Sequence, residues 1–229
     1  MRALGWMVLC AAGAAFADEL PALASTQRVV FENADVRVTE VNMAPGASEA
    51  EHYHARGVTI ALSDYQNETT ALPDGRVTSR ATKFGEVRWV DPAHHKTRNT
   101  GSTAQRVIRI ELKNPTPGSP SQLDAFDSVI AAKDTQRVLI ENADVRVVEE
   151  RTPPGVAQPK HRHRKSVLVP LVDSELEIAN IPSGDASAAP EPKVRRKIQA
   201  LTASWNPPSL HEVGNVGSTE ALNIRVEIK

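Results

Sequence analysis

The feature that most constrains the fold is an internal repeat that covers most of the chain. Residues Thr26–Asp64 match Thr135–Asp173 at a constant offset of 109, with 19 identities in 39 positions. Residues Trp89–Lys113 match Trp205–Lys229 at an offset of 116, with 11 identities in 25 positions. The chain is therefore a tandem duplication of a unit of about one hundred residues, a common size for one domain.

The two offsets differ by seven residues, so the second copy carries an insertion, which we place within Pro182–Pro192. Between the copies, Asn114–Pro120 is rich in Pro and is typical of an extended linker. Apolar residues recur with helical spacing in Ser121–Lys133, which predicts a short helix. The expected organisation is a first domain over residues 18–116, a linker with a short helix over 117–133, and a second domain over 134–229.

Each copy shows the patterns of short strands. Polar and apolar residues alternate in Val36–Val38, Arg109–Leu112 and Ile224–Ile228, and Pro-Gly pairs at residues 45–46 and 154–155 indicate turns between strands. Long helical periodicity is absent from the copies. These patterns predict an all-β protein in which each copy is a small antiparallel barrel or sandwich.

The N-terminus has the pattern of a secretion signal over residues 1–17. Arg2 is followed by the apolar run Leu4–Phe16, and Ala15-Phe16-Ala17 fits a cleavage site before Asp18. The run is too short to span a bilayer, so no membrane association is expected after cleavage; the alternative is a buried N-terminal helix. Cleavage would remove Cys10, the only cysteine, and leave a thiol-free chain in the periplasm or outside the cell.

Charge and aromatic content exclude several classes of protein. The chain has 28 acidic and 27 basic residues, and its nine aromatic residues are few for a platform that stacks single-stranded nucleic acid. We therefore expect no nucleic-acid partner. A single cysteine also excludes a disulfide scaffold, a cysteine-rich zinc module and an iron–sulfur protein.

All seven histidines fall into two equivalent sets. Because residues two apart on a strand face the same side, His52 and His54 project together, and a later strand could bring His95 beside them. Three imidazoles suit Fe, Mn, Ni, Zn or Cu; the alternatives are internal hydrogen bonding or binding of an organic ligand. His94 has only Leu210 as its counterpart in the second copy. The candidate metal ligands are His52, His54, His95, His161, His163 and His211.

These motifs resemble those of the cupin superfamily. In both copies a Pro-Gly pair and five further residues precede His-x-His, and a later histidine is followed by Asn and Gly. The matching residues are Pro45, Gly46, His52, His54, His95, Asn99 and Gly101, and then Pro154, Gly155, His161, His163, His211, Asn215 and Gly217. The chain is most similar to small single-barrel cupins, some of which are named for β-alanine degradation. The resemblance implies two tandem cupin barrels (double-stranded β-helix or jelly-roll) of six to eight strands, packed by a shared edge.

One position departs from the family pattern. Cupins usually carry a glutamate four residues after the second histidine, and Val58 and Val167 stand there instead. The resemblance then implies a metal held by three histidines without a carboxylate.

Further candidates for substrate binding are Arg56, Lys165 and His94. Arg56 and Lys165 follow the alternation of the histidines, so each could reach the cavity and attract a carboxylate, although a bend could expose both instead.

The resulting hypothesis is an exported metal-binding bicupin that acts on a small organic molecule, with a carboxylated one favoured. The reaction would be that of an oxidoreductase, dioxygenase-like, or of an isomerase. A non-catalytic binding or scaffold protein with relict metal sites is the alternative. The sequence assigns no catalytic residue, and it leaves open whether the chain is an enzyme and whether it forms a homodimer.

Overall fold

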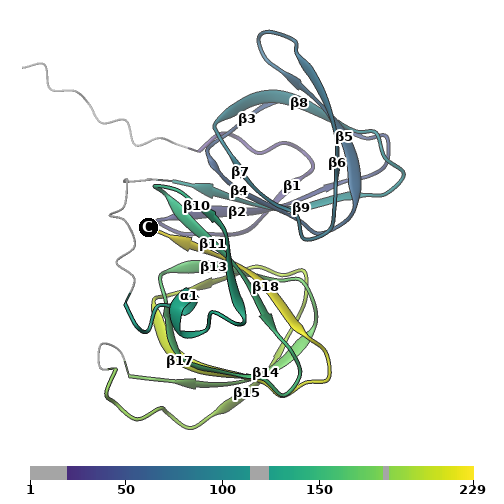
Figure 1. The fold of residues 1–229 in the computed structure, drawn as a ribbon. Coiled ribbons are helices and arrows are strands. Elements are labelled where there is room, and N and C mark those ends of the chain that lie inside the picture. The colour runs from purple at the N-terminus through teal and green to yellow at the C-terminus, as the bar shows by residue number, and fades with distance from the viewer. Residues whose placement is uncertain (1–19, 114–123, 183–185) are drawn as a thin grey trace, which may run out of the picture.

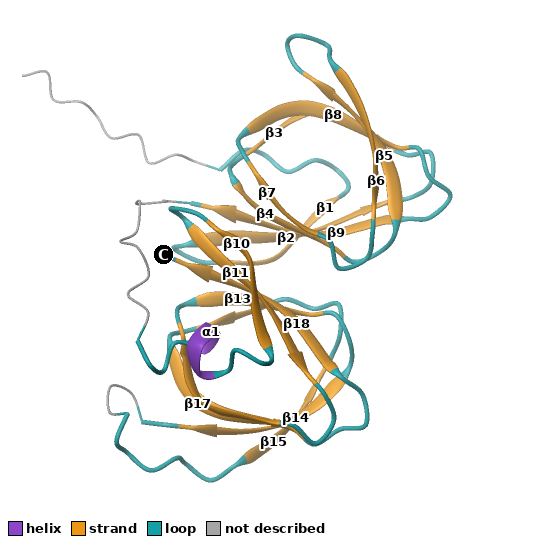
Figure 2. Ribbon diagram, in the orientation of Figure 1, coloured by secondary structure: helices purple, strands orange, loops and turns teal. Residues whose placement is uncertain are grey.

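The computed structural model describes residues 20–113, 124–182 and 186–229, which form two β-barrels (Figures 1 and 2). The predicted signal peptide and the first part of the linker lie outside the described residues. Within the described ranges, no helix is both long and apolar enough to cross a membrane.

The first barrel is built from two antiparallel sheets. The sheet that carries the hydrophobic face has the order β1-β2-β9-β4-β7, and the second sheet has the order β3-β8-β5-β6. The strands are β1 (Gln27–Glu32), β2 (Val36–Met43), β3 (Ser48–His54), β4 (Gly57–Ala61), β5 (Tyr65–Ala71), β6 (Val77–Thr82), β7 (Val87–Val90), β8 (Ala93–Asn99) and β9 (Gln105–Leu112).

The second barrel repeats this topology strand for strand. Its sheets have the orders β10-β11-β18-β13-β16 and β12-β17-β14-β15. The strands are β10 (Gln136–Glu141), β11 (Val145–Thr152), β12 (Ala157–His163), β13 (Ser166–Pro170), β14 (Ser174–Asn180), β15 (Val194–Ile198), β16 (Ser204–Asn206), β17 (Ser209–Asn215) and β18 (Ala221–Ile228). The duplication and the all-β fold are confirmed, with nine strands in the described part of each copy, more than the six to eight expected.

The predicted insertion and linker helix are both present. Leu176 pairs with Arg196 in the second barrel, whereas Asn67 pairs with Arg80 in the first, so the β14–β15 connection is longer by seven residues. The linker helix α1 (Ser128–Ala131) is a single turn, capped by Asp127, whose carboxylate accepts from the amide of Val129.

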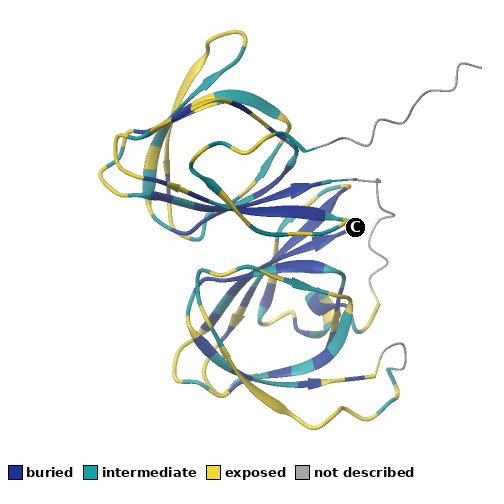
Figure 3. Ribbon diagram, turned by 180° about the vertical axis from the view of Figure 1, so that it is seen from behind, coloured by how far each residue is buried: buried dark blue, intermediate teal, exposed yellow. Residues whose placement is uncertain are grey.

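The two barrels meet face to face through their five-stranded sheets, and the expected packing by a shared edge is wrong. Figure 3 shows the buried residues concentrated on these sheets. The alternation of β2, β4 and β9 sends apolar side chains out of the first barrel, where they join their counterparts from the second in one cluster. Its buried members are Val36, Val38, Val58, Ile60, Leu62, Ile108, Ile110, Leu112, Val145, Val147, Val167, Val169, Leu171, Ile224, Val226 and Ile228.

In this arrangement the hydrophobic core lies outside the barrels, on the face where the two five-stranded sheets pack together. The main hydrophobic core lies between the barrels, and each such buried Val, Leu or Ile side chain stabilises the fold by about 1.5–3 kcal/mol. The opposite face of the same strands carries charged residues into the barrel interior, including Arg37, Arg109 and Glu111, each of which is less than one-tenth exposed. The interior is thereby left free for a polar site.

Candidate metal centres and the cavity of the second barrel

The structure brings the predicted histidines together in two triads. His52 lies directly opposite His95 in the β3–β8 ladder, and His161 lies opposite His211 in the β12–β17 ladder. Each triad offers three ligand atoms that lie within 4.8 Å of one another, and all six residues are buried except His95, which is partly buried. The prediction that a later strand supplies the third histidine is confirmed.

A turn and a buried asparagine fix the start of the histidine strand in the first barrel. Gly46 has a φ of 75°, a left-handed conformation that glycine adopts without strain. The side chain of Asn99 donates to the carbonyl of Met43 at 2.9 Å, and its backbone carbonyl accepts from the amide of Gly46 at 3.0 Å. Asn215 makes the same pair of contacts in the second barrel, with Thr152 and Gly155. Both histidine strands are therefore held to their neighbours at the same point.

Hydrogen bonds at Nδ1 determine which nitrogen of each imidazole faces the centre. His52 and His161 each place Nδ1 at 2.7 Å from a backbone carbonyl, that of Ala50 and that of Pro159. His54 and His163 place Nδ1 at 3.2 and 3.1 Å from the carboxylates of Glu111 and Glu227. Because carbonyl and carboxylate oxygens only accept, Nδ1 carries the proton and Nε2 carries a lone pair.

In the first barrel, two of these Nε2 atoms then face each other as bare acceptors. Nε2 of His52 lies 3.0 Å from Nε2 of His54, and Nε2 of His161 lies 3.1 Å from Nε2 of His211. In the second pair Pro159 fixes His161 as an acceptor, whereas no contact among the described residues fixes the tautomer of His211, whose Nε2 can donate to His161. In the first barrel, the lone pairs of His52 and His54 repel unless a cation lies between them, and metal–imidazole bonds of about 2.0–2.1 Å can reach both nitrogens. The residues therefore fit a divalent metal ion.

The protonation equilibria favour metal binding. Burial lowers the pKa of His54, His161 and His163, because a desolvated imidazolium is unfavourable. Burial, followed by the charges of the neighbouring histidines, lowers the pKa of His95 and His211 to about 3. These imidazoles are neutral at physiological pH, so their lone pairs are available to a metal.

A buried carboxylate supports one histidine of each triad. Glu111 accepts from His54 and also from Arg37, with 2.9 Å between the Nε of Arg37 and Oε2. Burial alone raises the pKa of Glu111, but these two hydrogen bonds outweigh it and lower the pKa to about 2. Glu227 in turn accepts from His163 and from Nε of Arg146 at 2.7 Å. An ionised carboxylate of this kind orients the imidazole and increases its basicity toward a metal.

The second barrel adds the linker to this chain of contacts. Arg146 also donates to both carboxylate oxygens of Asp127, at 3.0 and 3.1 Å. Asp127 caps helix α1, so the linker helix is tied to His163 through Arg146 and Glu227.

A second carboxylate lies beside each triad, but it comes from a different strand in each barrel. In the first barrel Glu49 lies on β3, with 3.6 Å between its Oε2 and Nε2 of His52, and Gln158 stands at the equivalent position of the second barrel. In the second barrel Glu150 lies on β11, with 3.7 Å between its Oε1 and Nε2 of His163, and Val41 is its equivalent in the first. The carboxylate has thus changed position between the copies.

Sequence reasoning missed both of these glutamates. A β-bulge between Glu49 and His52 adds one residue to β3, so residues three apart face the same side of the sheet. Strict alternation places Glu49 on the outer face, and no sequence signal marks the bulge. Glu150 was detectable only through its alternation with Arg146 on the inner face of β11.

The usual glutamate position of cupins is not part of either site. Val58 and Val167 are fully buried in the core between the barrels. The bend at residues 55–56 breaks the alternation that links them to the histidines, so they face away from the triads. Their identity therefore says nothing about the charge of the metal sites.

The three weaker candidates also lie away from the triads. Arg56 donates to Asp144 at 3.3 Å and Lys165 donates to Asp35 at 2.5 Å, and both ion pairs join one barrel to the other. His94 lies on the outer face of β8, stacked on Tyr53 with 3.8 Å between ring centroids, and its Nε2 lies 2.6 Å from Glu51. The structure thus assigns Arg56 and Lys165 to the interface between the barrels.

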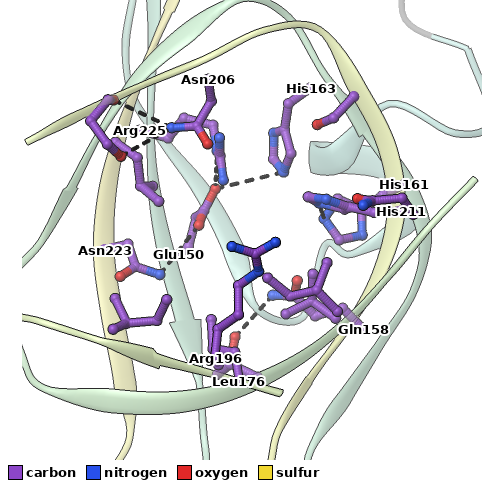
Figure 4. Close-up of a pocket in the computed structure, with 18 of the residues that line it drawn as sticks. Glu150, Gln158, His161, His163, Leu176, Arg196, Asn206, His211, Asn223 and Arg225 are labelled. Atoms are coloured by element: carbon purple, nitrogen blue, oxygen red, sulfur yellow. Dashed lines mark hydrogen bonds and ion pairs between the residues drawn. The ribbon is translucent and has the colours of Figure 1, made fainter. Parts of the chain in front are cut away.

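The triad of the second barrel opens into a cavity of about 490 Å³ (Figure 4). Glu150 lies inside it, paired with Arg225 and 3.4 Å from the amide nitrogen of Asn223. Burial raises the pKa of Glu150, but the charges of Arg225 and the nearby histidines, together with the hydrogen bond from Arg225, outweigh it, so the net direction is downward. The cavity therefore combines three imidazoles, an ionised carboxylate and arginine side chains, a set that could bind and polarise a small polar molecule.

No family model and no curated protein matches the chain. Solved structures that are similar include AerE from Microcystis aeruginosa, at 13% identity over 90% of this chain and 98% of that chain, with a TM-score of 0.58. A Cupin 2 conserved barrel domain protein from Leptotrichia buccalis is 8% identical over 89% of this chain and 88% of that chain, with a TM-score of 0.53.

The oxalate decarboxylase of Bacillus subtilis, a protein with Mn(II) centres, is similar as well. It is 12% identical over 91% of this chain and 77% of that chain, with a TM-score of 0.54. These similarities cover both barrels at once and agree with the motifs and the strand order of each copy. These similarities show that the chain has the cupin fold, with two barrels in one polypeptide.

Proposed function

We propose that the chain is an exported, metal-dependent enzyme, an oxidoreductase or isomerase, that converts a small organic acid in its second barrel. The observation that carries the proposal is the buried triad of His161, His163 and His211, whose ligand atoms lie within 4.8 Å of one another on the wall of the cavity. The Mn(II) centres of the oxalate decarboxylase support a divalent ion in a barrel of this fold. Fe, Mn, Ni, Zn and Cu all accept imidazole ligands, so the donor set leaves the identity of the ion open.

In the second barrel, the histidines would hold the metal ion and a glutamate would act on the substrate. A divalent ion bound by His161, His163 and His211 would polarise an oxygen atom of the substrate as a Lewis acid. Glu227 and the carbonyl of Pro159 keep two of these imidazoles in the orientation that directs Nε2 to the centre. Glu150, kept ionised by Arg225, is the carboxylate closest to the triad within the cavity and would accept a proton from the substrate.

The first barrel differs in the groups around its triad. Glu49 lies beside His52, and Val41 stands where the second barrel has Glu150. The buried Arg109 is paired instead with Glu111, with 3.5 Å between its Nε and Oε1, and burial lowers the pKa of Arg109 to about 10. We assign the reaction to the second barrel and metal binding without turnover to the first.

Turnover of short linear mono- and dicarboxylic acids by the untagged protein, loaded with Mn(II) or Fe(II), tests this assignment. Loss of each acid is followed by NMR for the wild type, His161→Ala and the matched variant His52→Ala. The proposal expects conversion by the wild type and His52→Ala, and none by His161→Ala. Stoichiometric metal binding without conversion of any acid would instead support a non-catalytic binding protein, and conversion that survives in His161→Ala would refute the assignment to the second barrel.

We also propose export, on the pattern of residues 1–17. N-terminal sequencing of the protein recovered from the periplasm or medium should begin at Asp18. An intact Met1 in the mature protein would contradict cleavage.

A further inference from the structure

The cavity of the second barrel is lined by an exposed arginine that has no partner among the described side chains. Arg196 on β15 lines the cavity, and Figure 4 shows its guanidinium pointing into the interior, on the side of Leu176 and Gln158. Arg225 is paired with Glu150 and with the hydroxyl of Ser166 at 3.1 Å. Within the described residues, Arg196 has no hydrogen-bond or ion-pair partner, so its five donors are available to a ligand.

The first barrel shows how the same position behaves when it is not free. Arg80 pairs with Asn67 across β5 and β6 as Arg196 pairs with Leu176 across β14 and β15, so the two arginines are equivalent. Arg80 forms an ion pair with Glu86. At the equivalent position the second barrel has Thr202, whose hydroxyl donates to the carbonyl of Gln199 at 2.9 Å. Loss of that glutamate in the second copy is what frees Arg196.

The cavity wall next to Arg196 is apolar in the second barrel, whereas the equivalent residues of the first barrel are polar. Leu176, Ile178, Val194 and Ile198 line the cavity, whereas the first barrel has Asn67, Thr69, Thr78 and Thr82 at these positions. The cavity of the second copy is thus lined by apolar side chains, by an unpaired arginine and by three histidines. A ligand that contacts both the apolar side chains and the arginine carries an apolar body and an anionic group.

We propose that Arg196 forms an anion subsite for a carboxylic acid whose apolar body packs on Leu176 and Ile178. The planar guanidinium fork matches a carboxylate with two parallel hydrogen bonds. The location of the reacting end of the acid at the histidines rests on the proposed function, but binding at Arg196 does not require a metal. A cavity of about 490 Å³ is much larger than a two-carbon acid, so acids with an aliphatic or aromatic body are the favoured class.

Calorimetric titration of the full chain with hexanoate tests the subsite, with hexan-1-ol as the uncharged probe and butyrate as the shorter acid. Binding is measured once in EDTA and once with Mn(II), and the metal content of each sample is determined. The wild type should bind hexanoate more tightly than hexan-1-ol by about 10- to 100-fold, as expected for hydrogen bonds to a charged group. Hexanoate should exceed butyrate by up to about fourfold for each additional CH₂ group.

Three variants locate the effect. Arg196→Gln should lose the preference for hexanoate over hexan-1-ol. Thr202→Glu should weaken hexanoate binding, because the new glutamate would form an ion pair with Arg196 as Glu86 does with Arg80. Arg195→Gln is the matched control, because Arg195 lies on the same strand but is paired with Glu175 outside the cavity. Unchanged circular dichroism and melting temperature confirm that each variant is folded.

The outcomes separate this inference from the proposed function. Hexanoate binding in EDTA that depends on Arg196, in a protein that binds no metal, would support the subsite and refute the metal-dependent enzyme. Stoichiometric metal binding with hexanoate affinity unchanged in Arg196→Gln would refute the subsite alone. Absence of hexanoate binding to the wild type, with or without Mn(II), would also refute the subsite.

Discussion

The two barrels carry the same histidine triad in different electrostatic surroundings. The first has Glu49 on β3 and Val41 on β2, and the second has Gln158 on β12 and Glu150 on β11. Each interior thus keeps a second carboxylate beside its triad while its position has moved by one strand. The comparison shows that a carboxylate lies near the triad in both copies, although a different strand supplies it in each.

The change has consequences for the rest of each cavity. In the second barrel Glu150 pairs with Arg225, and Arg196, which has no counterpart to Glu86 beside it, lies exposed next to an apolar wall. In the first barrel Arg80 is paired and the neighbouring wall is polar. One copy is thereby equipped for a ligand and the other for an ion beside a carboxylate.

The largest effect is expected from substitutions in the hydrophobic core that the two barrels share, and it concerns the free energy of unfolding. Ile108 and Ile224 are equivalent residues, and each is 1% exposed in that core. Substitution of either by Ala leaves a cavity on the common face, so each variant should lower the free energy of unfolding by about 2–5 kcal/mol. Urea denaturation measures the change.

The matched control for the core is Ile130→Ala, because Ile130 is 43% exposed on the linker helix. It should change the free energy of unfolding by less than about 0.5 kcal/mol. Equal effects at Ile108, Ile224 and Ile130 would contradict a core located between the barrels.

A smaller effect is expected when the orienting carboxylates are neutralised. Glu227→Gln removes the carboxylate that accepts from His163, and Glu111→Gln does the same for His54. Each variant should weaken the metal affinity of its own barrel by about 10- to 100-fold and leave the other barrel unchanged. Competition with a chromophoric chelator measures both affinities, and a fall in both barrels from one variant would show a general loss of structure instead.

Exchange of Glu49 and Gln158 sharpens the comparison more directly. Glu49→Gln should weaken metal binding in the first barrel, because it removes the carboxylate that lies 3.6 Å from His52. Gln158→Glu should strengthen binding in the second barrel for the same electrostatic reason. We expect the metal affinity to change by about 5- to 10-fold in each direction, equivalent to about 1 kcal/mol. Titration with Mn(II), followed by electron paramagnetic resonance, distinguishes the two sites, and effects of the same sign would contradict this role of Glu49.

The smallest effect concerns the ion pairs that flank the barrel interface. Arg56→Ala and Lys165→Ala each remove one pair, with Asp144 or with Asp35. Because both side chains are partly exposed, each loss should lower the free energy of unfolding by about 0.2–1 kcal/mol, and less at high salt. Thermal denaturation at two salt concentrations checks this, with no change in hexanoate binding; a loss of ligand affinity would return Arg56 or Lys165 to the binding site.

The sequence was sufficient for the repeat, the strand pattern and the grouping of six histidines into two triads, because identity between copies and alternation along strands are local properties. His52, His54 and His95 were placed together since each lies on a strand whose inner face the pattern identifies. The insertion was placed correctly because the two offsets bracket it.

The remaining features depend on geometry that alternation does not contain. The bulge before His52 reverses the face of Glu49, and the bend at residues 55–56 reverses the face of Val58. Arg56 and Lys165 point away from the histidines because their partners, Asp144 and Asp35, belong to the opposite barrel. The freedom of Arg196 follows from the absence of a glutamate at Thr202, which becomes visible only when the structure pairs the two copies.

The central claim is that the two triads bind metal, and the metal content of untagged protein tests it most directly. After supplementation with Fe, Mn, Ni and Zn, the wild type should hold close to one ion for each of the two triads. His52→Ala and His161→Ala should each hold about half of that amount, and the double variant should hold none. A wild type that binds no more metal than the double variant would contradict the claim.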